Sequence, residues 1–196
     1  DQATDQVTSL LTTNCGPVWF ANDGIPRQFA YAGHGVFTIR RLNEQKVVQE
    51  FALDVEGSLD DLGVRALAVS EDATRCAAAV TNSADGRIAV WDAATGEHVG
   101  SLTNTCTALA ISPDARCLAT GDADGNVCVW ALPGLNKIAS FQQSRDTVHC
   151  LAFRRDLSEP VESAAEHPWL LAAGDAGGTV WIYRLGARKL MTICHG

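Results

Sequence analysis

The stretch DADGNVCVWALPG, Asp122–Gly134, has the same form as SADGRIAVWDAATG, Ser83–Gly96. Each stretch begins with an Asp-Gly turn, continues through an alternating apolar run to a Trp, and closes at a Gly. The two Trp residues, Trp91 and Trp130, are 39 positions apart. Matched features at a fixed spacing are typical of a repeat architecture. The repeat therefore indicates the class of fold even before individual strands are assigned.

Four segments of the chain each contain four short runs of alternating apolar and polar residues, bounded by Gly, Asp, Asn, Ser or Pro. The segments span residues 15–52, 64–103, 106–142 and 147–194. The alternation predicts β-strands joined by turns, because no stripe with a helical period persists over three turns. Four sets of four strands predict four antiparallel sheets of one design. Since radial repetition of such sheets is a β-propeller, we expect an all-β fold with four blades of a partial ring.

The residues around the two Trp positions resemble the WD-repeat family, and the resemblance covers nearly the whole chain. That family places a Trp-Asp pair at the end of the third strand of each repeat, and an Asp in the turn before that strand. Val90–Asp92 matches the pair fully, whereas the Gly-His dipeptide that usually opens a repeat is missing, which removes a hydrogen-bond partner of the turn Asp. The resemblance implies structural roles for Trp91, Asp92, Trp130, Tyr183, Asp85 and Asp124.

Two acidic insertions lengthen the repeat, at residues 54–63 and 154–168. Both are rich in turn formers, so we expect solvent-facing loops that either dock a basic partner or are simply solvated. A binding surface would lie at the end of the propeller that carries the turns between second and third strands and the loops between blades. The residues predicted for partner binding there are Asp54, Glu56, Asp60, Asp61 and Arg145.

Composition narrows the classes of partner and cofactor. The 196 residues carry a formal net charge of −8, which disfavours nucleic acid, whose phosphates attract Lys and Arg. No apolar run approaches the ~20 residues of a membrane span, and no secretory signal is visible. The seven cysteines form no CxxC pair or zinc-ligand cluster, so we expect buried thiols in a reducing, cytoplasmic compartment and no metal or cofactor. Because the sequence begins with Asp, we expect a piece of a longer protein.

No constellation of residues predicts an enzyme. The five histidines fall at unrelated positions of the pattern, and His149 and Cys150 are strand neighbours expected on opposite faces. The GHG turn at residues 33–35 lacks the helix that phosphate binding needs. One Asp per turn is too sparse for the converging oxygens of a cation site, so turn stabilisation is predicted for Asp85, Asp122, Asp124 and Asp175.

Four blades are too few for a closed ring, since propellers of this family usually have about seven or eight. An open arc exposes two apolar sheet faces, more than monomeric proteins tolerate. We expect further blades of a longer chain, a second chain or a copy of this chain to cover them. The resemblance implies a non-catalytic protein–protein interaction scaffold or sensor. The alternatives are a propeller enzyme that uses the central channel and a reader of histone tails or other basic peptides.

Overall fold

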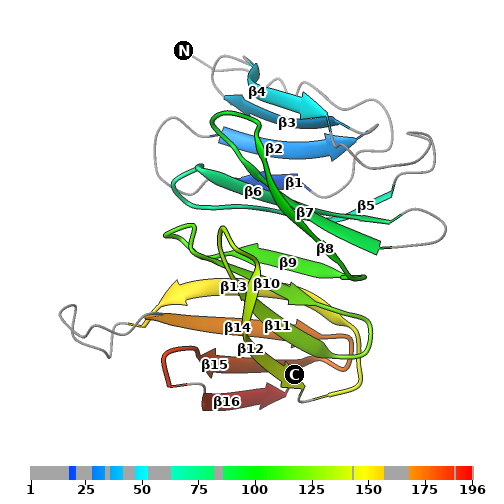
Figure 1. The fold of residues 1–196 in the computed structure, drawn as a ribbon. Coiled ribbons are helices and arrows are strands. Elements are labelled where there is room, and N and C mark those ends of the chain that lie inside the picture. Colours follow the sequence, from blue (N-terminus) through cyan, green and yellow to red (C-terminus); the bar gives the residue numbers. More distant parts are fainter. Residues whose placement is uncertain are drawn as a thin grey trace, which may run out of the picture.

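The structure is a computed structural model, and it describes residues 18–20, 28–33, 36–41, 47–52, 63–81, 86–142, 144–156, 168–187 and 189–195. Every regular element in these residues is a β-strand, and the strands form four four-stranded antiparallel sheets (Figure 1). The predicted all-β fold is therefore confirmed. The described ranges contain no helix with the length and apolar character to cross a membrane.

Each sheet consists of four consecutive strands, and the sheets are called blades 1 to 4 in chain order. Blade 1 contains β1 (Val18–Phe20), β2 (Gln28–Gly33), β3 (Val36–Arg41) and β4 (Val47–Ala52). Blade 2 contains β5 (Gly63–Val69), β6 (Arg75–Thr81), β7 (Gly86–Asp92) and β8 (His98–Thr103). Blade 3 contains β9 (Ala108–Ile111), β10 (Cys117–Gly121), β11 (Asn126–Ala131) and β12 (Asn136–Gln142). Blade 4 contains β13 (Val148–Arg155), β14 (Trp169–Asp175), β15 (Thr179–Arg184) and β16 (Lys189–His195).

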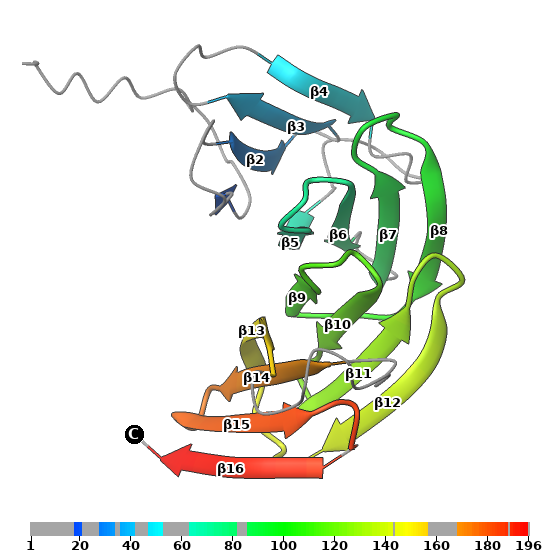
Figure 2. The same cartoon turned by 90° about the vertical axis from the view of Figure 1, so that its left-hand side faces the viewer.

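The four blades fan out side by side into an open arc (Figure 2). The first strand of each blade faces the centre of the arc, and the fourth strand lies at its rim. This is the arrangement of a partial β-propeller, in which four-stranded sheets repeat around an axis.

In blades 2 and 3, burial decreases with distance from the centre of the arc. The inner strand β9 reads ALAI, and every residue in it is buried. These residues are buried because neighbouring sheets converge there. The rim strands β8 and β12 mix half-buried with exposed residues, because the blades diverge toward the rim and leave one edge to solvent.

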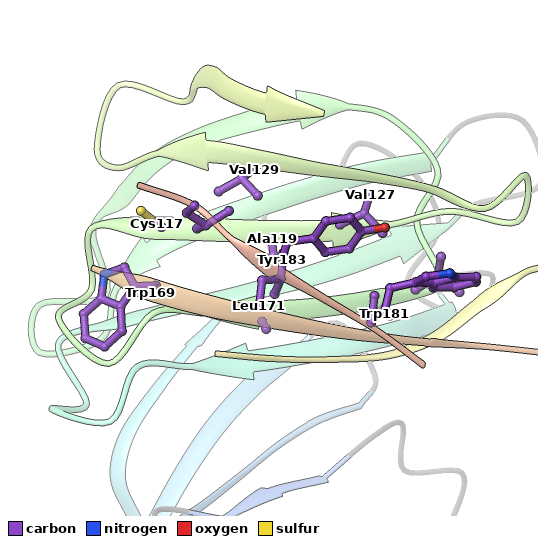
Figure 3. Close-up of a cluster of buried hydrophobic side chains, with 13 residues drawn as sticks. Cys117, Ala119, Val127, Val129, Trp169, Leu171, Trp181 and Tyr183 are labelled. Atoms are coloured by element: carbon purple, nitrogen blue, oxygen red, sulfur yellow. The ribbon is translucent and has the colours of Figure 1, made fainter. Parts of the chain in front are cut away.

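Apolar clusters fill the spaces between neighbouring blades. Phe37 and Trp91 belong to the cluster between blades 1 and 2, and Ile88 belongs to the cluster between blades 2 and 3. Val127 and Leu171 belong to the cluster between blades 3 and 4, which Figure 3 shows in close-up. Each blade is therefore held to the next by buried apolar area, at roughly 25 cal/mol for each Å² removed from water.

The turn between first and second strands is built alike in blades 2 and 3. The Ser70 hydroxyl donates to Asp72 Oδ1 in one blade and the Ser112 hydroxyl donates to Asp114 Oδ1 in the other, at 2.6 Å in both. Each serine oxygen also accepts a backbone amide at the start of the second strand, at 2.9 Å in both blades. The repeat therefore extends to the hydrogen bonds of its turns.

The expectation of buried thiols is wrong for two cysteines. Cys76, Cys106, Cys117 and Cys128 are buried, but Cys150 and Cys194 are exposed. The exposed pair lies in blade 4, whose far side is covered by no other described blade (Figure 2).

The expectation that residues 154–168 form a solvent-facing loop is wrong at the start of this segment. Strand β13 continues to Arg155, and Asp156 is buried. The Asp156 Oδ2 atom lies 2.6 Å from Arg184 Nε, so an ion pair within blade 4 holds this carboxylate inside the fold.

Candidate functional site

Blades 3 and 4 bring two turns and one connecting loop to the same end of the arc. They are the β10–β11 turn (residues 122–125), the β12–β13 loop (residues 144–147) and the β14–β15 turn (residues 175–178). These three segments are called the loop face. In an antiparallel meander, the turn after the second strand and the connection after the fourth lie at one end. The loop face is thus at the end where the sequence predicts partner binding.

Hydrogen bonds join the three segments into one unit. The Val148 amide donates to the Asp122 carbonyl at 3.0 Å, and the Ala176 amide donates to the Thr147 carbonyl at 2.9 Å. The Thr147 hydroxyl donates to the Ala123 carbonyl at 3.2 Å. The connecting loop is therefore held by both turns, which gives the loop face a defined shape on a rigid scaffold.

Thr107 joins the inner strands of blades 3 and 4 at this end. Its hydroxyl lies 3.1 Å from the Gly121 carbonyl and 2.6 Å from the Val148 carbonyl, so both oxygens are acceptors for it. The sequence alone does not indicate this role, because the contact to Val148 joins residues far apart along the chain.

Gly125 allows the connecting loop to lie directly on the β10–β11 turn. Its φ is +80°, and a Cβ on this residue would lie 2.4 Å from the Ser144 carbonyl oxygen. Only glycine combines this backbone conformation with so close an approach. The Asp-Gly pair in the repeated stretch therefore serves both the turn and the packing of the loop.

Asp122 is the residue on which the hydrogen bonds of the β10–β11 turn converge. Its Oδ1 accepts from the Asp124 amide at 2.9 Å and from the Asn126 amide at 2.8 Å. Its Oδ2 accepts from Asn126 Nδ2 at 2.8 Å. Asp124, the position that the family resemblance singles out, has an exposed side chain in the same turn.

Asp175 is the equivalent residue in the β14–β15 turn. Burial raises the pKa of Asp175, but hydrogen bonds from the Thr179 and Gly177 amides outweigh burial and hold the pKa below its ordinary value. The Thr179 amide donates to Asp175 Oδ1 at 2.8 Å. Asp175 is therefore negatively charged at neutral pH, and it stabilises its turn as the sequence predicts.

The loop face is acidic. Its charged residues are four aspartates and one arginine: Asp122, Asp124, Asp146, Asp175 and Arg145. The side chains of Asp124, Asp146 and Arg145 are exposed. The Ser144 hydroxyl donates to Asp146 Oδ2 at 3.3 Å and accepts from the Asp146 amide at 2.8 Å, which orients this carboxylate within the loop. The carboxylates of Asp124 and Asp146 thus face solvent, and Ser144 orients that of Asp146.

The aromatic residues at the end of the third strands each pack toward the preceding blade. Trp91 is 1% exposed and shares a cluster with Phe37 of blade 1. Trp130 is half-buried against the cluster between blades 2 and 3. Tyr183 stacks on Phe141 of blade 3 with 4.1 Å between ring centroids. Tyr183 belongs to the cluster in Figure 3, and burial raises the pKa of Tyr183 to about 12.

Asp92 lies at the opposite end of the blades, in the β7–β8 turn. Its Oδ1 accepts from the amides of Ala94 and Thr95, at 3.0 Å each, and its Oδ2 forms an ion pair with Arg75. This residue of the Trp-Asp pair therefore stabilises a turn and does not contribute to the loop face.

Several predicted residues lie outside the described part of the chain, namely Asp54, Glu56, Asp60, Asp61 and Asp85. Of the residues predicted for partner binding, Arg145 is described, and it lies on the loop face. Asp146 beside it was not predicted. The Ser-x-Asp spacing of residues 144–146, which residues 70–72 and 112–114 share, is a signal that would have found it.

Within the described ranges, no group of three or more His, Cys, Asp or Glu residues could hold a metal ion. His98 lies on the rim strand β8, where its Nε2 is 2.8 Å from Ser101 Oγ. The His98 ring also packs edge-on against Trp91, with 6.1 Å between ring centroids. These contacts give His98 a place in the packing of blade 2.

The sequence model of the family described as "WD domain, G-beta repeat" matches residues 52–92 and 96–131. These two stretches are therefore WD repeats. The first match ends with β7, and the second runs from β8 through β11. Each WD repeat therefore ends at the third strand of a blade, and the second repeat supplies the rim strand of blade 2 and three strands of blade 3. Because the repeats and the blades are offset by one strand, the second repeat contributes strands to two neighbouring blades.

Two curated relatives also match this chain. It is 30% identical over 145 residues to the U3 snoRNP-associated protein-like YAO of Arabidopsis thaliana, an alignment that covers 62% of this chain and 28% of that protein. It is 26% identical over 170 residues to the Autophagy-related protein 16 of Arabidopsis thaliana, covering 83% of this chain and 31% of that protein. The chain thus spans less than two thirds of the length of either relative.

Proposed function

We propose that this chain is a non-catalytic protein–protein interaction module, a scaffold or sensor, whose loop face binds a basic segment of a partner protein. WD repeats generally mediate protein–protein interaction, and the family match supports that class of function. We infer a basic partner because the Asp124 and Asp146 carboxylates are exposed and lie on segments that hydrogen bonds join together.

Charge complementarity and preorganisation both favour binding of a basic segment at the loop face. A Lys or Arg side chain that approaches the loop face meets two exposed carboxylates and the further negative charge of Asp122 and Asp175. Such complementarity raises the association rate and selects against acidic partners. Each exposed pair contributes about 0.2–1 kcal/mol, so specificity requires several contacts. The hydrogen bonds within the loop face reduce the entropy lost when a partner binds.

We also propose that the chain is part of a larger assembly and lies in the cytoplasm. One relative is named for its association with the U3 snoRNP, which supports a place in a larger assembly for this chain as well. The free thiols of the described cysteines support a reducing compartment such as the cytoplasm.

A peptide-binding measurement tests the proposal. Fluorescence anisotropy would compare a Lys- and Arg-rich peptide with a peptide of equal length in which Glu replaces each basic residue. We expect binding of the basic peptide only, and a loss of about three- to fivefold in affinity for each of Asp124→Asn and Asp146→Asn. The affinity should fall steeply between about 50 and 500 mM salt, because these contacts are exposed.

Glu97→Gln is the matched control, since Glu97 is an exposed carboxylate in the β7–β8 turn at the opposite end of the blades. It should leave the affinity unchanged. Equal binding of the acidic peptide, or an equal loss with Glu97→Gln, would refute the proposed binding surface.

A further inference from the structure

The β10–β11 and β14–β15 turns begin with equivalent aspartates, and only one of them has both carboxylate oxygens paired. Asp122 Oδ2 accepts from Asn126 Nδ2 at 2.8 Å. Strand pairing places Thr179 at the position of Asn126 in blade 4, where its amide donates to Asp175 Oδ1 at 2.8 Å. Asp175 Oδ2 is buried and has no hydrogen-bond partner among the residues that the structure describes. The β14–β15 turn therefore lacks one donor that the β10–β11 turn has.

The oxygen without a partner belongs to a carboxylate that is both charged and buried. Asp175 is 9% exposed, and the hydrogen bonds from the Thr179 and Gly177 amides keep it ionised at neutral pH. The Ser144 hydroxyl donates to Asp146. A buried charged group with an unmade hydrogen bond costs free energy, so a donor from outside the chain that reaches Asp175 recovers part of that cost. A cationic donor recovers more than a neutral one, because charge-assisted hydrogen bonds are stronger.

Gly177 leaves a space beside this carboxylate. A Cβ on Gly177 would lie 2.8 Å from Asp146 Oδ2 and 3.4 Å from Asp175 Oδ1. One carboxylate belongs to the β12–β13 loop and the other to the β14–β15 turn, so two charges from different segments face the same point. Gly177 is exposed, and so are its neighbours Ala176 and Gly178, which places this point at the surface.

Blade 3 has no equivalent space. Strand pairing places Asp124 at the position of Gly177, so the β10–β11 turn carries a side chain where the β14–β15 turn has none. In blade 4 the turn has lost this side chain, and Asp146 of the connecting loop brings a carboxylate to the same place. The combination of a small open space and two carboxylates is therefore particular to blade 4 among these two blades.

We propose that this space over Gly177, called the cation site, binds the ammonium group of a lysine side chain of the partner protein between Asp146 and Asp175. Both carboxylates lie within 3.4 Å of the place of a single Cβ, so the space between them is small. An ammonium is a compact charge with three donors, whereas a guanidinium is a broad planar fork. Three donors match the Asp146 carboxylate, the Asp175 carboxylate and the Ser144 oxygen. The cation site therefore selects lysine over arginine.

A metal ion fits this place less well than an ammonium group. Calcium takes about six to eight oxygen ligands, and the described part of the chain holds no group of three or more His, Cys, Asp or Glu residues suited to a metal. The cation site rests on the proposed function, because it names the side chain by which the loop face would recognise a basic partner.

NMR titrations of the whole isotope-labelled chain test the cation site. The probes are Nα-acetyl-lysine amide, Nα-acetyl-arginine amide and Nα-acetyl-norleucine amide, which carry an ammonium, a guanidinium and no charge. We expect the lysine probe to shift the backbone amide signals of Asp146, Gly177 and Thr179 saturably. The arginine probe should bind about threefold more weakly or worse, and the norleucine probe should leave these signals unchanged.

Gly177→Ala fills the space without changing any charge. Its φ lies outside the left-handed region, and the nearest atom to the new Cβ is the end of the exposed Asp146 side chain, so the turn keeps its backbone. We expect the lysine probe to bind about threefold more weakly to this variant, and also to Asp175→Asn, which keeps an acceptor for the Thr179 amide.

Gly134→Ala is the matched control. Gly134 lies in the β11–β12 turn at the opposite end of the blades, and its Cβ would likewise meet a polar side-chain end, Asn136 Nδ2, at 2.9 Å. This variant should bind the lysine probe as the wild type does.

Equal affinities of the lysine and arginine probes would overturn the cation site, and so would unchanged lysine binding by Gly177→Ala. Saturable shifts of the same signals with calcium chloride, at lower concentrations than with the lysine probe, would assign the place to a metal ion and also overturn it. The basic peptide judges the proposed function separately. If the peptide binds wild type and Gly177→Ala equally, only the cation site fails, whereas binding of the lysine probe without binding of the peptide means that only the proposed function fails.

Discussion

Trp91 and Trp130 occupy the same position in adjacent WD repeats, yet their surroundings differ. Trp91 is almost completely buried, and its cross-strand neighbour on β8 is His98. Trp130 is half-buried, and its Nε1 donates to the Thr120 hydroxyl at 3.1 Å. The Lys137 ammonium lies 5.0 Å from the Trp130 ring centroid, within the range of a cation–π contact. The same motif is thus stabilised mainly by apolar packing in blade 2 and partly by polar contacts in blade 3.

The cause of this difference lies in neighbouring strands. In blade 2 the residue equivalent to Thr120 is Ala78, which carries no hydroxyl. The residue after the Trp differs as well, since Asp92 follows Trp91 whereas Ala131 follows Trp130. A motif therefore places a side chain between blades, and its local environment decides how that side chain contributes to stability.

The largest effect is expected from truncation of the indoles. Trp91→Ala should lower the free energy of unfolding by about 3–5 kcal/mol, because it removes a fully buried side chain between blades 1 and 2. Trp130→Ala should cost less, about 1–3 kcal/mol, because the ring is only half-buried. Urea unfolding followed by circular dichroism measures both values. A larger cost for Trp130→Ala would contradict the comparison.

A smaller effect is expected from the Trp130–Thr120 hydrogen bond. Thr120→Val should lower the free energy of unfolding by about 1 kcal/mol, since it leaves the indole N–H without this acceptor and keeps the side-chain shape. In a Trp130→Phe background the same change should cost little. A double-mutant cycle should therefore give a coupling of about 0.5–1.5 kcal/mol, and zero coupling would show that the bond contributes nothing.

The smallest effect is expected from Asp92. Burial raises the pKa of Asp92, but hydrogen bonds from the Thr95 and Ala94 amides and the contact with Arg75 outweigh it and hold the pKa below 3.8. Because the folded pKa is lowered, the stabilisation is complete above the ordinary carboxyl pKa. It is lost as the pH falls from about 5 through the folded pKa.

Asp92→Asn should therefore lower the free energy of unfolding by at most about 1 kcal/mol at pH 7, because the ion pair is partly exposed. The difference from the wild type should shrink below about pH 4. Thermal unfolding across this pH range measures it, and Arg75→Gln should remove part of the same pH dependence. A difference that stays constant down to about pH 2 would exclude Asp92 as the titrating group.

Local features of the fold were predictable from the sequence. The strands follow from apolar alternation, and the turns follow from Asp-Gly and Ser-x-Asp pairs whose hydrogen bonds span a few residues. The acidic end of the propeller was expected in outline. Asp146 and Thr147 on the connecting loop were not predicted. The role of Thr147 depends on hydrogen bonds to turns in two different blades.

The sequence by itself determined the four-strand period, the position of each aromatic residue at the end of a third strand, and the turn chemistry, because these depend on neighbours close along the chain. Only the tertiary structure decided which of these positions are buried. Asp156 is inside because Arg184 pairs with it, and Cys150 is exposed because no described blade covers it. Burial depends on which sheets come face to face, and that is set by contacts between distant segments.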